Sequence, residues 1–258
     1  MWQKELDIAK KAAVKAGEAI MDIYNNAKDM EIEYKDGDMP LTVADRAANE
    51  IIIRMLSETF PEYAILSEEE KDDRERLKND CCFVVDPLDG TKEFIKRNGQ
   101  FTVNIALSYL GKSIMGVIYV PVTRELYWAS EENGAYLTSD GKTDRIHVSN
   151  RRDDIRVVMS SSHGCAEMDS LILKNNLTNY VRVGSSLKGC MIAKGDAEIY
   201  YRFNPTMEWD TAAMQCIVEE AGAVFRQMDD TPMRYNRENS RNEKGFYIIN
   251  CMENKMEW

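Results

Sequence analysis

The chain has 258 residues, of which 44% are apolar and 30% are charged, and its formal net charge is −11. This composition is typical of a soluble globular protein with one or two compact units and excludes a disordered or fibrous chain. The acidic balance argues against a nucleic-acid polymer as partner, because phosphate backbones bind basic surfaces. A small anionic substrate fits where metal ions or local Lys and Arg side chains offset the charge. The alternative explanation of the net charge is a solvated surface that keeps the protein soluble.

The six cysteines do not resemble a disulfide framework or a zinc site, since two are adjacent, Cys81 and Cys82, and none forms a C-x-x-C pair. We expect them to be reduced and mostly buried. No apolar stretch reaches about 18 residues, and charges run through the N-terminal segment, so the sequence predicts neither a membrane span nor a signal peptide. These features predict a cytoplasmic location, with loose peripheral association with the inner membrane left open.

Apolar residues recur at helical spacing in two N-terminal segments, which predicts two amphipathic helices. Thr42 is placed to cap the second helix, and Asp45 lies in its first turn. In chain order the predicted elements are a helix at 4–26, a strand at 30–35, a break at 36–40, a helix at 41–61 and a strand at 63–70. The last strand runs into three glutamates, Glu68, Glu69 and Glu70.

The stretch FVVDPLDGTKEFI, residues 83–95, ends an apolar run with two acids, a proline and a glycine. Residues 81–85 are apolar and rich in β-branched side chains, which predicts a buried strand. Pro87 has no amide hydrogen and Gly90 permits a left-handed backbone, so a tight turn is predicted to end the strand. Thr91 is then placed to cap a short helix, whose amino terminus would attract phosphate.

Asp86 and Asp89 lie beside this predicted anion site. Two carboxylates would repel a phosphate unless a cation lay between them, and hard oxygen ligands of this kind suit Mg²⁺. The alternative is a plain strand-to-helix turn with an N-capping aspartate, since such residues are common in turns.

The rest of the chain predicts two kinds of layer. Residues 100–138 alternate like an antiparallel meander with turns at Leu110-Gly111 and Asn133-Gly134. Strands and helices then alternate, which is typical of an α/β layer. Their ranges are strand 155–162, helix 167–174, strand 180–186, helix 187–196, strand 197–203 and helix 210–222. We therefore predict an N-terminal α+β unit at 1–150 and a C-terminal α/β unit at 151–258, pressed together around one cleft.

Further acids lie at the ends of predicted elements. Glu68 follows a strand, whereas Asp45 and Asp210 lie in first turns of helices. A solvated loop would explain the glutamate, and complementation of the helix dipole would explain the aspartates. A layered fold can nevertheless bring residues at element ends together at one cleft.

The segments KDGDMPLTVAD, LSEEE, DPLDGTKEF and EWDTAA, in this order, resemble the inositol monophosphatase superfamily of Mg²⁺-dependent, lithium-sensitive phosphatases. The resemblance spans nearly the whole chain. Within it, DPLDGTKEFIKRNGQFTVNIAL is most similar to 3′(2′),5′-bisphosphate nucleotidases of the CysQ type, whereas inositol monophosphatases usually have another residue at Lys92. The resemblance implies an α/β, or α+β, fold: a layered α-β-α-β-α sandwich of the inositol monophosphatase/fructose-1,6-bisphosphatase type.

The resemblance also implies ligands for two or three Mg²⁺ ions. Glu68, Asp86 and the Leu88 carbonyl would hold the first ion, and Asp86, Asp89 and Asp210 would hold a second. Oxygen ligands of both kinds suit this hard ion. A pair of such ions can stabilise the attacking and leaving oxygens of a phosphoryl transfer.

The implied catalytic residues are Asp45, Thr91 and Glu68. Asp45 would orient the Thr91 hydroxyl, which together with Glu68 would take the proton from the attacking water. Gly90 and Thr91 would supply N–H groups to the scissile phosphate. Lys35 is either an ordinary surface lysine or, as its place in the family implies, a residue near the catalytic acids.

Four residues of the C-terminal half match positions that contact adenosine bisphosphate in the nucleotidases: His163, Ser185, Lys188 and Arg202. His163 has an alternative as a cap or surface residue, and Lys188 as a solvated helix residue. Arg202 lies in an apolar strand, which favours a paired or ligand-facing charge. The full set of implied substrate contacts is Glu68, Leu88, Asp89, Gly90, Thr91, His163, Ser185, Lys188, Arg202 and Asp210.

Two departures from the family pattern concern the substrate side and the last helix. Ser161, Ser162 and His163 stand where related bacterial sequences often have an arginine before the serine and histidine, so one substrate-side cation is absent from that segment. Met214 stands where a glycine is frequent, which predicts altered packing behind Asp210. Neither departure changes the implied metal ligands.

The leading hypothesis is hydrolysis of the 3′-phosphate of adenosine 3′,5′-bisphosphate (PAP) to AMP and phosphate, with its sulfated precursor PAPS, converted to APS, as a second substrate. The first alternative is a superfamily phosphatase that acts on inositol monophosphate or another sugar phosphate. The second is a non-catalytic sensor that binds metal and nucleotide. The superfamily includes monomers and dimers, so the oligomeric state is left open.

Overall fold

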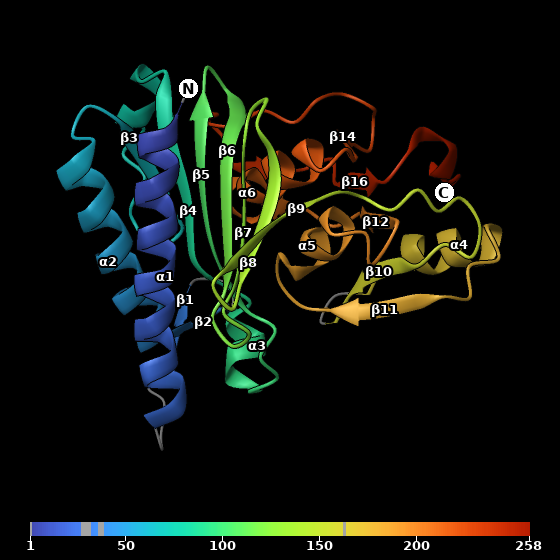
Figure 1. The fold of residues 1–258 in the computed structure, drawn as a ribbon, viewed down its shortest axis with the longest axis horizontal. Coiled ribbons are helices and arrows are strands. Elements are labelled where there is room, and N and C mark those ends of the chain that lie inside the picture. Colours follow the sequence, from blue (N-terminus) through green and yellow to red (C-terminus); the bar gives the residue numbers. More distant parts are fainter. Residues whose placement is uncertain (1, 27–31, 36–38, 162–163) are drawn as a thin grey trace.

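Two β-sheets and three layers of helices form the molecule, as Figure 1 shows. The computed structural model describes residues 2–26, 32–35, 39–161 and 164–258, with only the backbone described at 32–35 and 39–42. The helices are α1 (Gln3–Asn26), α2 (Val43–Thr59), α3 (Thr91–Ile95), α4 (Ala166–Lys174), α5 (Leu187–Ala193), α6 (Glu208–Glu220), and the 3-10 helices η1 (Glu75–Lys78) and η2 (Met252–Asn254).

The first sheet has seven strands, and only its first pair, β3 and β4, is parallel. Its order is β3 (Ala64–Ser67), β4 (Cys81–Asp89), β5 (Thr102–Tyr109), β6 (Lys112–Val120), β7 (Glu125–Ser130), β8 (Gly134–Ser139) and β9 (Lys142–Ile146). The hairpin turns at Leu110-Gly111 and before Gly134 confirm the predicted meander.

The second sheet has five strands and mixes parallel with antiparallel pairs. Its order is β11 (Tyr180–Val183), β10 (Val157–Ser160), β12 (Ile199–Arg202), β16 (Phe246–Ile249) and β14 (Val224–Gln227). Two small antiparallel pairs complete the described strands: β1 (Ile32–Lys35) with β2 (Met39–Thr42), and β13 (Thr206–Met207) with β15 (Arg241–Asn242).

Side-chain alternation along the strands creates three cores between the five layers. In β4, Phe83 joins the core beneath α1 and α2, whereas its neighbour Val84 joins the core that contains α5 and α6. In β16, Ile248 belongs to this central core and Ile249 to the core beneath α4. Each such side chain stabilises the fold by about 1.5–3 kcal/mol when fully buried. The predicted α-β-α-β-α sandwich is therefore confirmed.

The central core includes residues from both predicted units, because α6 packs on the first sheet as well as beneath the second. The Ser113 hydroxyl on β6 donates to the Ala212 carbonyl of α6 at 2.7 Å. Gly116 on β6 permits this approach, since a Cβ there would lie 2.3 Å from the Ala213 carbonyl oxygen. The division into units at 1–150 and 151–258 stays a prediction.

The prediction that the strand at 81–85 ends in a tight turn is wrong, because β4 continues to Asp89. The register shifts between Asp86, which pairs with Asn104, and Asp89, which pairs with Thr102. This bulge places one extra residue opposite Val103, so that Pro87 lies where the ladder is already interrupted.

Two cap or boundary predictions also differ from the structure. Thr91 is the first residue of α3 rather than its cap, because Gly90 precedes it in the left-handed region at φ 97° and no side-chain cap bond forms. The predicted break at 36–40 is partly a strand: β2 pairs antiparallel with β1, whereas residues 36–38 lie outside the described residues. Because Leu41 and Thr42 belong to β2, helix α2 begins at Val43 instead of the predicted residue 41.

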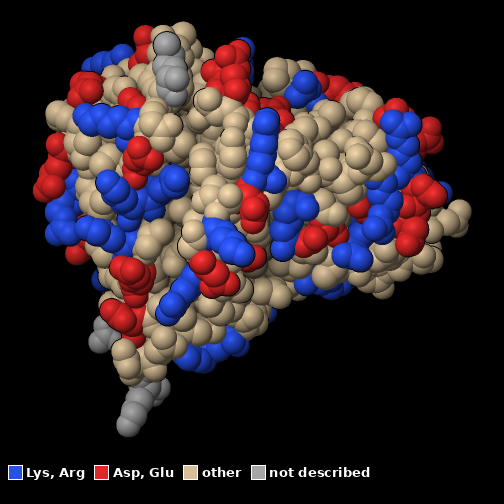
Figure 2. Space-filling view, viewed as in Figure 1, with Lys and Arg blue, Asp and Glu red and all other residues tan. Residues whose placement is uncertain are grey.

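Acidic and basic side chains lie intermixed over the face shown in Figure 2. All six cysteines are unpaired; Cys82, Cys190 and Cys216 are buried, so half rather than most of them are. Among the helices of the described residues, none is both long and apolar enough to cross a membrane.

Candidate active site

Three carboxylates converge where the two sheets and α6 meet. Oxygen atoms of Asp86, Asp89 and Asp210 all lie within 4.8 Å of one another. Asp86 and Asp89 flank the bulge of β4, and Asp210 lies in the first turn of α6. The structure thus brings these three acids together, and their role as metal ligands stays a prediction.

Asp86 has the environment of a metal ligand. Its side chain is 1% exposed, and its Oδ1 atom is buried without a hydrogen-bond partner among the described residues. Burial, followed by the charges of Glu68, Asp89, Asp210 and Asp45, raises the pKa of Asp86 well above its ordinary value. Since charged groups are rarely buried unless paired or liganding a metal, a cation fits this donor set.

Asp210 has a similarly perturbed acidity. Burial, and then the charge of Asp89, raises the pKa of Asp210 from 3.8 to about 7, although its Oδ2 accepts a 2.6 Å hydrogen bond from the Met207 amide. This bond joins the N-cap residue to the third residue of α6 and fixes the carboxylate at the helix start. The Asp210 Oδ2 atom is thus held by the helix start, whereas Asp210 Oδ1 takes no part in this bond.

Glu68 and Asp45 lie close enough to Asp86 for their charges to act on it. Glu68 directly follows β3, and its amide donates to the Val85 carbonyl at 3.1 Å, which places it beside Asp86 on the neighbouring strand. Asp45 is 3% exposed in the first turn of α2. The Thr91 hydroxyl lies 3.4 Å from the Leu88 carbonyl oxygen, and its predicted contact with Asp45 stays a prediction.

Gly90 joins the acidic cluster to the residues that are predicted to contact a nucleotide. A Cβ at this position would lie 3.0 Å from the Gln100 carbonyl oxygen and 3.3 Å from the Ser185 Cβ. Such distances, together with the positive φ, require glycine. The turn that carries Asp89 therefore lies directly against Ser185.

Ser185, Lys188 and Arg202 lie near one another, and their predicted contact with a nucleotide stays a prediction. Lys188 is 6% exposed, its Nζ donates to the Ser185 carbonyl, and it lies 5.5 Å from the centre of the Tyr200 ring. The alternative of a solvated lysine is thus wrong. Burial lowers the pKa of Lys188 to about 8, with the Arg202 charge acting in the same direction. Arg202 donates through Nε to the Asn204 carbonyl at 3.3 Å.

Two predicted site positions cannot be placed. His163 lies outside the described residues, and Lys35 is described only as a backbone position in β1. Ser161, by contrast, is described: its hydroxyl donates to the Gln100 side-chain oxygen at 3.3 Å.

Three polar residues that the sequence reasoning missed surround Asp89. The Ser186 hydroxyl donates to Asp89 Oδ2 at 2.6 Å, Asn104 Nδ2 reaches the same oxygen at 3.2 Å, and Thr102 Oγ1 lies at 3.4 Å. Asn104 did carry a signal, because it is an amide inside a strand of buried side chains. Ser186 carried none apart from its place next to Ser185.

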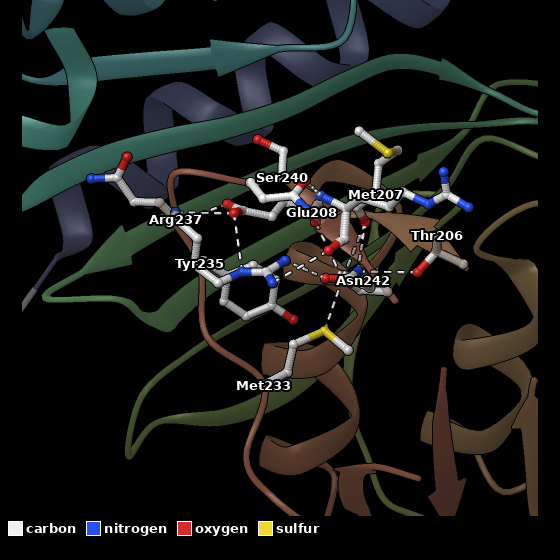
Figure 3. Close-up of polar contacts among 12 residues, drawn as sticks. Thr206, Met207, Glu208, Met233, Tyr235, Arg237, Ser240 and Asn242 are labelled. Carbon is white, nitrogen blue, oxygen red and sulfur yellow. Dashed lines mark hydrogen bonds and ion pairs between the residues drawn. The ribbon is translucent and has the colours of Figure 1, made fainter. Parts of the chain in front are cut away.

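A second polar network holds the start of α6, as Figure 3 shows. The fully buried Glu208 accepts hydrogen bonds from the amides of Asn236 and Arg237, at 2.6 and 3.0 Å, and lies 3.2 Å from Arg237 Nε. Asn242 donates to the Met207 carbonyl at 2.9 Å. These contacts support the turn from which Asp210 projects.

A cavity of about 510 Å³ lies beside the start of α6. Among its lining residues are Ser67 and Trp209, the chain neighbours of Glu68 and Asp210, together with Glu70 and Ser240. None of the carboxylates of the cluster is among its lining residues.

Comparison with known proteins identifies the relatives of this chain. The family model described as the inositol monophosphatase family matches residues 1–247. The chain is 42% identical over 234 residues to a Salmonella typhimurium protein named 3′(2′),5′-bisphosphate nucleotidase CysQ, which covers 90% of this chain and 94% of the relative. An Escherichia coli protein of the same name is 41% identical over 244 residues, with 94% and 98% covered.

Solved structures agree with these relatives. The crystal structure of CysQ from Bacteroides thetaiotaomicron has a TM-score of 0.86 at 42% identity and covers 97% of this chain and 99% of that chain. An inositol monophosphatase from Thermotoga maritima, at 24% identity and a TM-score of 0.80, shares the fold.

Proposed function

This chain belongs to the inositol monophosphatase family, and we propose that it is a 3′(2′),5′-bisphosphate nucleotidase that hydrolyses the 3′-phosphate of adenosine 3′,5′-bisphosphate to give AMP and phosphate. The observation that carries the proposal is the cluster of Asp86, Asp89 and Asp210, with a buried Asp86 oxygen that has no hydrogen-bond partner among the described residues. PAPS, converted to APS, is proposed as a second substrate.

The acidic cluster suits a cation, and we propose that it holds two or three Mg²⁺ ions. Glu68, Asp86 and the Leu88 carbonyl would hold one, and Asp86, Asp89 and Asp210 another. When bound, the ions supply the positive charge that lets a phosphate ester approach the acids and that acidifies the attacking water.

The chain's own residues position the reactants. Gly90 and Thr91 direct their amides at the scissile phosphate, at the start of α3. The Thr91 hydroxyl would take the proton of the attacking water as it passes its own proton to Asp45, while the Glu68 carboxylate accepts a hydrogen bond from the same water. This general-base role depends on where the Thr91 and Glu68 side chains lie, and it does not require an unusual pKa.

The nucleotide lies against the C-terminal half in this proposal. The buried Lys188 and the half-buried Arg202 supply positive charge for the second phosphate, and Ser185 and His163 supply polar contacts. The segment Ser161 to His163 has no arginine, so the proposal relies on Lys188 and Arg202 for this charge. We propose a cytoplasmic location, where thiols such as those of this chain stay reduced.

An assay of phosphate release tests the proposal directly. Adenosine 3′,5′-bisphosphate, inositol 1-phosphate and fructose 1,6-bisphosphate are each offered to the protein with Mg²⁺ and with chelator. We expect Mg²⁺-dependent release that is fastest from the nucleotide. Preference for inositol phosphate would overturn the substrate assignment, and tight nucleotide binding without any release would favour a sensor.

Asp86→Asn tests the metal assignment. Because Asp86 is proposed as a ligand of both ions, the substitution should reduce turnover by about 10²–10³-fold, the range for loss of one group that stabilises transition-state charge. The buried amide is uncharged, so the fold should persist in chelator. Circular dichroism and phosphate release are measured on the same preparation, and full activity would refute the assignment.

A further inference from the structure

The Ser186 hydroxyl makes the shortest hydrogen bond to Asp89. It donates to Oδ2 at 2.6 Å, compared with 3.2 Å from Asn104 and 3.4 Å from Thr102. Ser186 and Asn104 donate to the same oxygen and leave Oδ1 outside these bonds, whereas Thr102 gives its single proton to Asn104 Oδ1 at 3.0 Å and only lies near Oδ2. A hydroxyl bonded to an ionised carboxylate is among the strong hydrogen bonds of proteins.

The direction of this bond follows from its neighbours. Asn104 Nδ2 donates to Ser186 Oγ at 2.9 Å, and the Thr102 hydroxyl lies 3.0 Å from Asn104 Oδ1, which fixes the orientation of the amide. Ser186 Oγ therefore accepts from Asn104 and gives its single proton to Asp89. The other acceptor within reach, the Asp210 carbonyl, is distant at 3.5 Å. Ser186, Asn104 and Thr102 are each at most 1% exposed, so water does not replace these bonds.

Ser186 belongs to the nucleotide side of the molecule. It is the residue that precedes α5, between Ser185, which lies against Gly90, and Lys188, whose Nζ donates to the Ser185 carbonyl. A shift of this turn on nucleotide binding would therefore move the donor of Asp89, and a shift of Asp89 on metal binding would move the turn.

We propose that Ser186 is a positioning residue that couples nucleotide binding to metal binding. Its hydroxyl holds Asp89 in the orientation that receives the cation and transmits that orientation to the turn that carries Ser185 and Lys188. The inference rests on the proposed metal and nucleotide roles and adds to them a residue outside both ligand sets.

Loss of the Ser186 hydroxyl should affect both Mg²⁺ affinity and the coupling between the two ligands. Partners of metal ligands commonly contribute 10–100-fold to metal affinity, so loss of the Ser186 hydroxyl should weaken Mg²⁺ binding within that range. Coupling between two ligands is reciprocal, so the factor by which Mg²⁺ strengthens AMP binding equals the factor by which AMP strengthens Mg²⁺ binding. Without the hydroxyl this factor should fall toward one.

The test is isothermal titration calorimetry of Ser186→Ala and of the unsubstituted protein. Mg²⁺ is titrated with and without AMP, and AMP with and without Mg²⁺. The matched control is Ser108→Ala, because Ser108 is also 1% exposed, lies on β5 with Asn104, and has a buried hydroxyl without a hydrogen-bond partner among the described residues. Melting in chelator verifies that each variant folds.

The expected result is a 10–100-fold rise of the Mg²⁺ dissociation constant and a coupling factor near one in Ser186→Ala, with both quantities unchanged in Ser108→Ala. An unchanged coupling factor in Ser186→Ala overturns the inference. A folded Ser186→Ala protein with equal losses in both variants overturns it as well, since the effect would be general packing. Phosphate release by the unsubstituted protein is measured in parallel. Absence of release from that protein would contradict the proposed function, whereas the titrations of Ser186→Ala test the coupling.

Discussion

Buried carboxylates make the stability of this protein depend on what neutralises them. Asp86 is 1% exposed, and Asp86 and Asp210 each lie among other acids. Ionisation in such surroundings is costly, so without a cation these groups retain protons to a higher pH than usual. A divalent cation would replace the protons, and the site would then contribute to stability as well as to catalysis.

The metal-free protein should become less stable as pH rises from about 4 to 7. The pKa of Asp210 is 3.8 ordinarily and about 7 in the folded protein, so the folded state binds more protons than the unfolded state throughout this window. Stability from this group is present below pH 4 and is lost as pH approaches 7. At 1.36 kcal/mol per pKa unit, the loss is at most about 4 kcal/mol.

Urea unfolding in chelator, from pH 4 to 7.5, measures this effect as the difference between the unsubstituted protein and Asp210→Asn. The variant has no proton to lose at this position, so its stability should fall less steeply. Saturating Mg²⁺ should remove the slope from the unsubstituted protein. Parallel curves for the two proteins in chelator would contradict the prediction.

Lys188 should make nucleotide binding fail at alkaline pH. Burial lowers its pKa from 10.5 to about 8, so the side chain loses its charge above that pH and attracts the second phosphate less. The Michaelis constant for adenosine 3′,5′-bisphosphate should therefore rise between pH 8 and 9.5. In Lys188→Met it should be raised already at pH 7 and should then change little.

The control is Lys194→Met, which removes a less buried lysine from the end of the same helix, where it pairs with Asp196 at 2.9 Å. This variant should keep the alkaline rise. Steady-state kinetics over pH 7–9.5 decides, and an alkaline rise that survives in Lys188→Met would exclude Lys188 as its cause.

At the scale of elements, strand β4 shows what the sequence could and could not predict. The residue types around Asp86 and Asp89 predicted a metal and phosphate site, because two acids, a proline and a glycine follow a buried run. The same residues did not predict a bulge, because Pro87 and Gly90 suit a turn and an interrupted strand equally. The register of β4 with β5 decides between a turn and a bulge. This register pairs residues about 15 positions apart in the sequence, so a local sequence pattern does not show it.

Residues that support the site were harder to predict than residues that form it. Glu208 and Ser186 act through partners that are distant in sequence, Arg237 for the first and Asp89 for the second. A glutamate in a first helical turn and a serine before a helix have ordinary local explanations. Their buried partners become apparent only when the elements are packed.

Helices α5 and α6 pack through a small residue against a large one. A Cβ on Gly189 would lie 2.2 Å from Met214 Cγ, so the Met214 side chain must shift to accommodate any side chain there. Gly189→Ala should therefore destabilise the protein by about 1–3 kcal/mol, although alanine favours a helix over glycine by about 1 kcal/mol.

The matched variant Gly189→Ala/Met214→Ala should be more stable than additivity predicts, because the second substitution removes the atoms that the first one meets. Urea unfolding of the two single variants and the double variant gives the coupling. Additive free energies of unfolding would show that the helices do not meet at these two side chains.

At the scale of the whole molecule, the proposed site draws residues from both halves of the chain. The acids come from α2, the β3 end, β4 and α6, and the nucleotide-side residues from α5 and β12. Gln100, which precedes β5, links these groups: its side-chain oxygen accepts from the Gly184 amide at 2.8 Å and from the Ser161 hydroxyl at 3.3 Å. Both donors lie on the segments that carry the predicted nucleotide contacts.

Gln100→Ala should weaken nucleotide binding and leave the chemical step nearly intact. The substitution removes the acceptor of the Gly184 amide, and a hydrogen bond of this kind contributes about 0.5–1.5 kcal/mol, which corresponds to roughly a 2–13-fold rise of the Michaelis constant. The turnover number should change little, because no hydrogen bond described for this side chain reaches the acidic cluster. Gln227→Ala is the matched control, since Gln227 bonds Thr231 at the edge of the second sheet. If Gln100→Ala instead lowered the turnover number at an unchanged Michaelis constant, the segment around Gln100 would act on the metal side of the cleft, and the link between the two halves would serve catalysis rather than recognition.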